Sequence, residues 1–262
     1  METSIIFGLL LAVLVGVSLG LLGGGGSILA VPILTYVVGM EPREAIASSL
    51  FIVGVTSVFG LFSHARAKRV RWRTGLIFGL AAMGGAFSGG FIGGFIPGTV
   101  LMILFAVMMM ATAAAMIRRP KRASESNDTE RTGLPLPRII IDGFVVGIAT
   151  GLVGAGGGFL VVPALTLLGG LPMAVAVGTS LLVMSMKSFA GLAGYLFSVA
   201  IQWPIVLAFT AIAVVGSFIG AALAGKIPGP ALRRGFGFFV LVMGGIVLAQ
   251  EIPQAFALVT QN

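Results

Sequence analysis

The sequence contains no cysteine, one histidine and eight acidic residues among 262, and only 9% of its residues are charged. Without cysteine there can be no disulfide, no thiolate metal site and no thiol redox relay. One histidine and few carboxylates also leave too few groups for a metal centre or for acid–base catalysis. We therefore predict a protein that is not an enzyme and that needs no cofactor and no bound metal.

Hydrophobic residues make up 58% of the chain, and the mean hydropathy is +1.13, which leaves little material for a water-facing surface. Several runs approach or exceed the roughly 20 residues that a membrane-spanning helix needs. None alternates as a barrel strand would. The chain is therefore predicted to be an all-α polytopic membrane protein. Its net charge of +8 does not indicate nucleic acid, because the basic residues lie at the ends of hydrophobic runs and set topology.

Ten hydrophobic segments are separated by shorter polar stretches. They cover about residues 5–22, 27–39, 44–63, 74–95, 99–117, 139–153, 159–170, 174–200, 203–225 and 235–250. The charged stretch 118–138 is predicted to be a cytoplasmic linker. It separates a first membrane repeat, residues 1–117, from a second, residues 139–262.

The two halves align without a gap at one constant offset, which pairs Gly20 with Gly151 and Trp72 with Trp203. A register kept over some eighty residues identifies structural repeats. Basic residues crowd the loop that contains Arg69, and the matching loop of the second half has none. In the next loop the bias reverses, since Lys226 has no basic counterpart in the first half. The repeats are therefore predicted to be oppositely oriented.

Each half also contains a glycine-rich stretch that interrupts a hydrophobic run near a proline, Pro32 or Pro163. If each stretch is the tip of a re-entrant hairpin, every half has three further crossings after it, and this odd number inverts the second half. With both termini outside, all sixteen Lys and Arg residues except Arg43 and Lys187 then lie on the cytoplasmic side, which the positive-inside rule favours. The prediction is two inverted repeats with about eight full transmembrane helices and two glycine-tipped hairpins. Parallel repeats, with each stretch a broken crossing, are the alternative.

The glycine-rich tips offer backbone N–H groups without side chains in the way, and each opens a helix. Helix N-termini and N–H concavities of this kind bind anions. With inverted repeats the two tips would approach the bilayer middle from opposite sides and form one anion site. The candidate residues are Gly24, Gly25, Gly26, Ser27, Ala155, Gly156, Gly157 and Gly158. The alternative is that these glycines only allow close helix packing.

In the helix after each tip, hydroxyl residues and one lysine recur at i and i+7, a spacing that keeps them on one helical face. These further candidates are Ser49, Thr56, Ser180 and Lys187, and Thr56 matches Lys187 at the repeat offset. A lysine in the middle of a membrane segment is a functional-site hypothesis. It could neutralise a bound anion or carry a coupling proton, unless it snorkels to an interface or caps carbonyls. Lipid headgroups on the cytoplasmic face are expected to be bound by His64, Arg66, Lys68 and Arg69.

These glycine-rich runs, each followed by Val-Pro and then by Ala-x-x-x-Ser-Leu, resemble the sulfite exporter TauE/SafE family of membrane permeases. The resemblance covers almost the whole chain. It implies a multi-pass transporter in the bacterial or archaeal inner (plasma) membrane, whose substrate is a small sulfur-containing anion such as sulfite, sulfoacetate or another organosulfonate. The family motif includes both tips and the Ser helices, whereas Lys187 rests on its expected burial.

The sequence therefore predicts a secondary transporter that works by alternating access, with protons as a candidate coupling ion and no nucleic-acid partner. An anion channel would use the same donors along a continuous pathway, and a permease for an unrelated small anion also stays open. A scaffold protein would tolerate substitutions at both tips.

Overall fold

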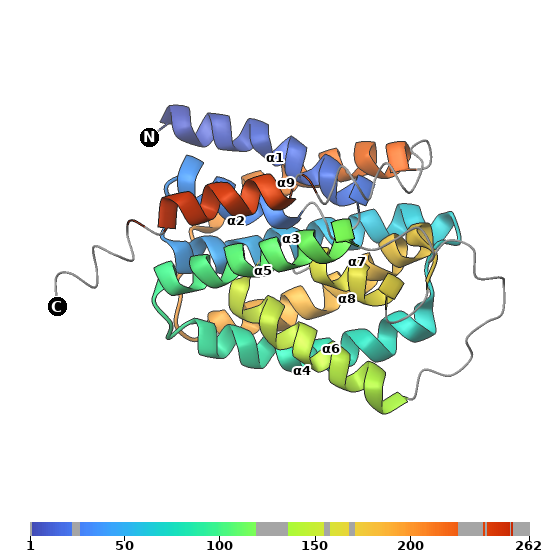
Figure 1. The fold of residues 1–262 in the computed structure, drawn as a ribbon. Helices are drawn as coiled ribbons and strands as arrows, with labels where there is room; N and C mark the ends of the chain where they lie inside the picture. Colours follow the sequence, from blue (N-terminus) through green and yellow to red (C-terminus); the bar gives the residue numbers. More distant parts are fainter. Residues whose placement is uncertain are drawn as a thin grey trace.

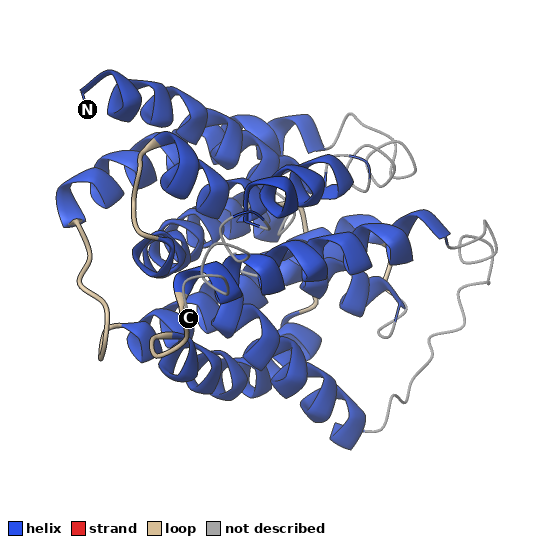
Figure 2. Cartoon of the chain, turned by 60° about the vertical axis from the view of Figure 1, so that its left-hand side comes forward, coloured by secondary structure: helices blue, strands red, loops and turns tan. Residues whose placement is uncertain are grey.

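The computed structural model describes residues 2–22, 27–118, 136–154, 158–167, 171–224, 238, 240–251 and 253. Within these ranges every regular element is helical (Figure 2). The elements are α1 (Glu2–Leu22), α2 (Ala30–Pro32), the π-helix η2 (Ile33–Val37), α3 (Pro42–Arg66), α4 (Trp72–Gly93), α5 (Gly98–Arg118), α6 (Leu136–Val153), α7 (Gly158–Leu167), α8 (Met173–Tyr195) and α9 (Trp203–Ala224). A further apolar helix covers Val240–Glu251.

Among the described residues, four helices are long and apolar enough to cross a membrane, namely Pro42–Arg66, Trp72–Gly93, Ala174–Tyr195 and Trp203–Leu223. The same part of the chain has five shorter apolar helices: Ile6–Leu21, Ser27–Val37, Gly98–Ala114, Ile139–Val153 and Val240–Glu251. The all-helical membrane class is therefore confirmed. The count of eight spans and the two re-entrant hairpins stay predictions.

Helices α1 and α9 pack along each other, and so do α4 and α6, which places each early helix of one half against a late helix of the other (Figure 1). Glycines allow the close approach. A Cβ added to Gly16 or Gly20 would lie within 3 Å of the carbonyl of Ala213 or Ser217. The backbones of the two helices are therefore in direct contact, as in small-residue membrane interfaces.

The second pair repeats the first at the 131-residue offset that separates Gly20 from Gly151. Four glycines of the first half face carbonyls of the second half: Gly16 faces Ala213, Gly20 faces Ser217, Gly85 faces Phe144 and Gly89 faces Ile148. At the offset, the matching glycines of the second half face the matching carbonyls of the first: Gly147 faces Ala82, Gly151 faces Ala86, Gly216 faces Val13 and Gly220 faces Val17. The two interfaces are thus equivalent, down to the carbonyl that each glycine faces.

Helices α3 and α8 cross at the centre and obey the same offset. A Cβ on Gly60 would lie 3.4 Å from Leu181, and a Cβ on Gly191 would lie 3.4 Å from Leu50. Each contact joins a late residue of one helix to an early residue of the other, so the two helices run antiparallel where they meet. This crossing joins a bundle of α1, α3 and α9 to a bundle of α4, α6 and α8. Each bundle therefore mixes helices of both sequence halves.

Candidate functional site

Lys187 lies in the middle of α8 with only 1% of its surface exposed. Its Nζ donates a hydrogen bond of 2.8 Å to Oγ1 of Thr150, in the last turn of α6. An ammonium group has three donors, and within the described residues Thr150 takes one of them. No carboxylate of that part of the chain lies within 4 Å of Nζ. The side-chain nitrogen is therefore buried, and it has no acidic partner among the described residues.

The end of α6 provides part of the reason why a lysine is tolerated here. The last carbonyls of a helix carry partial negative charge, which favours a nearby cation. Thr150 connects the lysine to these carbonyls. Its Oγ1 accepts from Nζ and also lies 3.2 Å from the carbonyl of Gly147, to which the hydroxyl can donate. The lysine head thus lies beside a helix C-terminus, and a helix dipole compensates only a fraction of a full charge.

Ser49 reaches the same place from α3. Its buried Oγ lies 2.7 Å from the carbonyl of Ile46 and 2.6 Å from that of Gly154. Gly154 follows the last residue of α6 with φ of +76°, a left-handed conformation that favours glycine, and its α-carbon packs against Ile46. The residue that ends α6 is therefore held by α3. The end of α6, directly before the second glycine-rich stretch, consists of Thr150 to Gly154. Ser49 contacts it from α3, and Lys187 contacts it from α8.

Ser49→Ala should lower stability by about 1 kcal/mol, because the Gly154 carbonyl loses its side-chain donor in a buried setting. The measurement is the thermal unfolding midpoint in detergent. Ser185→Ala is the matched control, since the Ser185 hydroxyl bonds only to its own helix at Leu182 within the described residues. Equal midpoints for the two variants would contradict the role of Ser49.

The positions related to these by the repeat offset reproduce part of this arrangement. Ser180 lies 2.7 Å from the carbonyl of Val177, just as Ser49 does from that of Ile46. Thr56, which matches Lys187, is fully buried, and its hydroxyl has no hydrogen-bond partner among the described residues. Ser27 is fully buried at the start of the turn before α2, and Gly158 is buried at the start of α7. Lysine and threonine at matched positions make the two halves chemically unequal.

The other predicted tip residues, Gly24, Gly25, Gly26, Ala155, Gly156 and Gly157, lie outside the described residues. The prediction that the two tips form one site therefore stays a prediction. In the described part of the chain no group of three His, Asp or Glu side chains could hold a metal ion.

His64 corrects one expectation. It was expected at the lipid headgroups, but it is 3% exposed, and its Nε2 lies 3.3 Å from the carbonyl of Gly20. A carbonyl only accepts, so Nε2 carries the hydrogen in this contact. The reason is that α3 continues past its hydrophobic run to Arg66 and turns His64 toward α1. A pocket of about 210 Å³ lies there, lined by His64, Arg69 and Ala221 among others.

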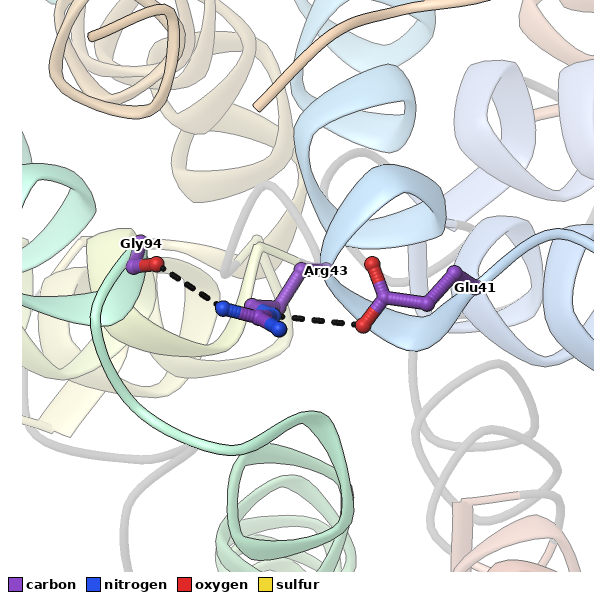
Figure 3. A network of polar contacts seen from close by, with 3 residues as sticks. All are labelled: Glu41, Arg43 and Gly94. Atoms are coloured by element: carbon purple, nitrogen blue, oxygen red, sulfur yellow. Dashed lines mark hydrogen bonds and ion pairs between the residues drawn. The ribbon is translucent and has the colours of Figure 1, made fainter. Parts of the chain in front are cut away.

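Arg43 shows the opposite situation to Lys187. Its Nε lies 3.2 Å from Oε1 of Glu41, and its Nη1 donates to the carbonyl of Gly94 at 3.3 Å (Figure 3). The side chain is 38% exposed. This arginine therefore ties the start of α3 to the end of α4 and already has an acidic partner.

Sequence reasoning missed Thr150, whose signal was a hydroxyl one helical turn before the glycine-rich run.

The chain is similar to a family of known description and to several proteins described as probable membrane transporters. The family described as sulfite exporter TauE/SafE matches residues 8–247. A probable membrane transporter protein of Xylella fastidiosa is 35% identical over 90% of this chain and 91% of its own. Similar proteins with the same description occur in Methanocaldococcus jannaschii, 27% identical over 91% and 94%, and in Bacillus subtilis, 29% identical over 83% and 87%. No solved structure matches the chain significantly.

Proposed function

Because the chain belongs to the sulfite exporter TauE/SafE family, we propose that it is a secondary transporter that moves a small sulfur-containing anion across the inner membrane. Sulfite, sulfoacetate and other organosulfonates are the candidate substrates. The chain is a multi-pass membrane protein with several apolar helices, and its relatives are described as probable membrane transporters, which indicates transport and not catalysis.

The observation that carries the proposal is the buried Lys187 nitrogen beside the end of α6, which has no acidic partner among the described residues. A charge inside a membrane protein is costly and is retained where it serves a substrate or ion pathway. A bound anion would supply the missing counter-charge. It would also accept hydrogen bonds from the N–H groups of the Lys187 ammonium that do not bond to Thr150. In this proposal the anion lies next to the second glycine-rich stretch and also receives backbone N–H groups from it.

We further propose that the two halves are inverted repeats and that the anion lies between them. The reciprocal contacts of Gly60 with Leu181 and of Gly191 with Leu50 support this, since they require antiparallel equivalent helices. Alternating access then consists of one mixed bundle, α1, α3 and α9, rocking against the other, α4, α6 and α8, about the α3–α8 crossing. The moving bodies differ from the two sequence halves, because the glycine-packed interfaces join helices across the repeats.

The test is counterflow of ³⁵S-sulfite and of labelled sulfoacetate in proteoliposomes loaded with the unlabelled anion. A transporter gives saturable uptake that depends on the internal anion, whereas uptake that rises linearly and ignores the internal anion would indicate a channel and overturn the proposal.

Thr150→Val should weaken the apparent affinity for the anion about tenfold, because the lysine head loses a hydrogen bond worth about 1.5 kcal/mol that orients it. Thr210→Val is the matched control, since that buried hydroxyl bonds to the carbonyl of Val206 in its own helix. Counterflow affinity in both variants is the measurement. An unchanged affinity in Thr150→Val would remove this threonine from the site.

A further inference from the structure

A second ionisable side chain is buried far from Lys187 in the sequence. Glu251 ends the helix Val240–Glu251, and 2% of its surface is exposed. Its Oε1 accepts a hydrogen bond of 2.7 Å from the hydroxyl of Tyr36 in η2. Its Oε2 is buried and has no partner among the described residues. One carboxyl oxygen is thus held in place, and the other has no hydrogen-bond partner among the described residues.

The other acidic side chains near this end of the bundle are paired and lie near solvent. Glu41 is paired with Arg43, and Glu44 accepts from the backbone N and the side-chain Nε2 of Gln202 at 3.0 and 3.2 Å. Within the described residues Glu251 has no basic group within 4 Å. In the described part of the chain, therefore, no salt bridge accounts for the burial of this carboxyl.

The backbone around Tyr36 also departs from a regular α-helix. Tyr36 lies in a π-helical turn, in which the N–H of Val38 bonds to the carbonyl of Ile33 at 3.0 Å. Single π turns are frequent at functional sites. At the matched position of the second half, the last residue of α7 is Leu167 in place of Tyr36. The residue that matches Glu251 is Pro120, so an acid–tyrosine pair occurs once in an otherwise repeated scaffold.

We propose that Glu251 binds the proton whose movement drives anion transport, and that Tyr36 positions its carboxyl for this. The inference rests on the proposed function and assigns its energy source to a residue. The proton comes from the aqueous phase and adds to Oε2, and no other bond changes. Tyr36 is the titratable group that faces the carboxyl from η2. Helix α5, which packs on the helix of Glu251, has no ionisable side chain from Gly98 to Ala114.

The experiment separates exchange from net transport. Proteoliposomes with a pH-sensitive dye inside are assayed for ³⁵S-sulfite and labelled sulfoacetate, first as counterflow at equal pH and then as net uptake under an imposed pH gradient. Glu251→Gln should keep counterflow within about threefold of wild type. Its gradient-driven uptake should fall to the level without a gradient, at least tenfold, and the dye signal that accompanies anion movement should vanish. Glu251→Asp, which keeps a carboxyl, should retain that signal, and Glu44→Gln is the control for a partly exposed carboxylate.

Gradient-driven uptake that persists in Glu251→Gln would overturn the proposal, and so would loss of counterflow together with net uptake in a monodisperse variant. If the Gln variant does not yield folded protein, Tyr36→Phe decides. Its ratio of gradient-driven uptake to counterflow should fall at least threefold, and an unchanged ratio would overturn the proposal. Wild-type counterflow without proton movement would reject the coupling role and leave the proposed function intact, whereas no counterflow of either anion would reject both.

Discussion

Lys187→Met should reduce anion counterflow at least about 100-fold and leave a folded, monodisperse protein. In the proposed function this buried side chain supplies the positive charge that pairs with the bound anion, and loss of one partner of a buried ion pair costs about 3 to 5 kcal/mol. Methionine has a similar length and no charge, so the packing between α8 and α6 is largely kept. The measurement is counterflow of ³⁵S-sulfite and sulfoacetate, together with the thermal unfolding midpoint.

The competing reading is that Lys187 only neutralises the C-terminal dipole of α6. It predicts a lower unfolding midpoint with counterflow intact, because a helix-dipole contact is worth about 0.3 to 2 kcal/mol and no substrate contact is lost. Lys68→Met serves as the control for a lost positive charge outside the bundle, since Lys68 lies in the loop between α3 and α4 and is exposed. Intact counterflow in Lys187→Met would take this lysine out of the transport mechanism.

Gly20→Ala and Gly151→Ala should each lower stability by about 2 to 3 kcal/mol, and by similar amounts. Alanine normally favours a helix over glycine by about 1 kcal/mol. At these positions its Cβ would lie within 3 Å of the carbonyl of Ser217 or Ala86, so two helices must move apart along their contact. The measurement is the unfolding midpoint in detergent and the yield of monodisperse protein.

Gly245→Ala is the matched control, because among the described residues nothing lies within 4 Å of an added Cβ there. It should be neutral or slightly stabilising. A large loss in Gly20→Ala with none in Gly151→Ala would show that the two glycine interfaces are not equivalent in energy, and it would weaken the case for two matched bundles.

Much of the local structure could be predicted from the sequence. Hydropathy placed the helices within a few residues of their observed ends, since a helix in a membrane must be apolar over its length. The constant offset between Gly20 and Gly151 identified the repeat, and the observed contacts obey it. The burial of Lys187 followed from its distance to either end of a hydrophobic segment.

The partners of these residues could not be predicted. Thr150 is one of many hydroxyl residues in apolar segments, and only the packing of α6 on α8 distinguishes it. His64 lies next to a basic cluster in the sequence, yet the continued helix carries it inward to Gly20. Glu251 and Tyr36 are 215 positions apart, and neither has a counterpart in the other half that could have drawn attention to the pair.

By itself the sequence determined the class of protein, the segments, the repeat and the burial of one cation, because these depend on composition and on spacing along one helix. Tertiary structure decided that α1 packs on α9 and α4 on α6, that Ser49 of one half holds Gly154 of the other, and that Tyr36 faces a buried carboxyl. The physical reason is that glycine permits a close approach without specifying which helix approaches. That choice is made when all helices pack together, and it also decides which polar side chains meet.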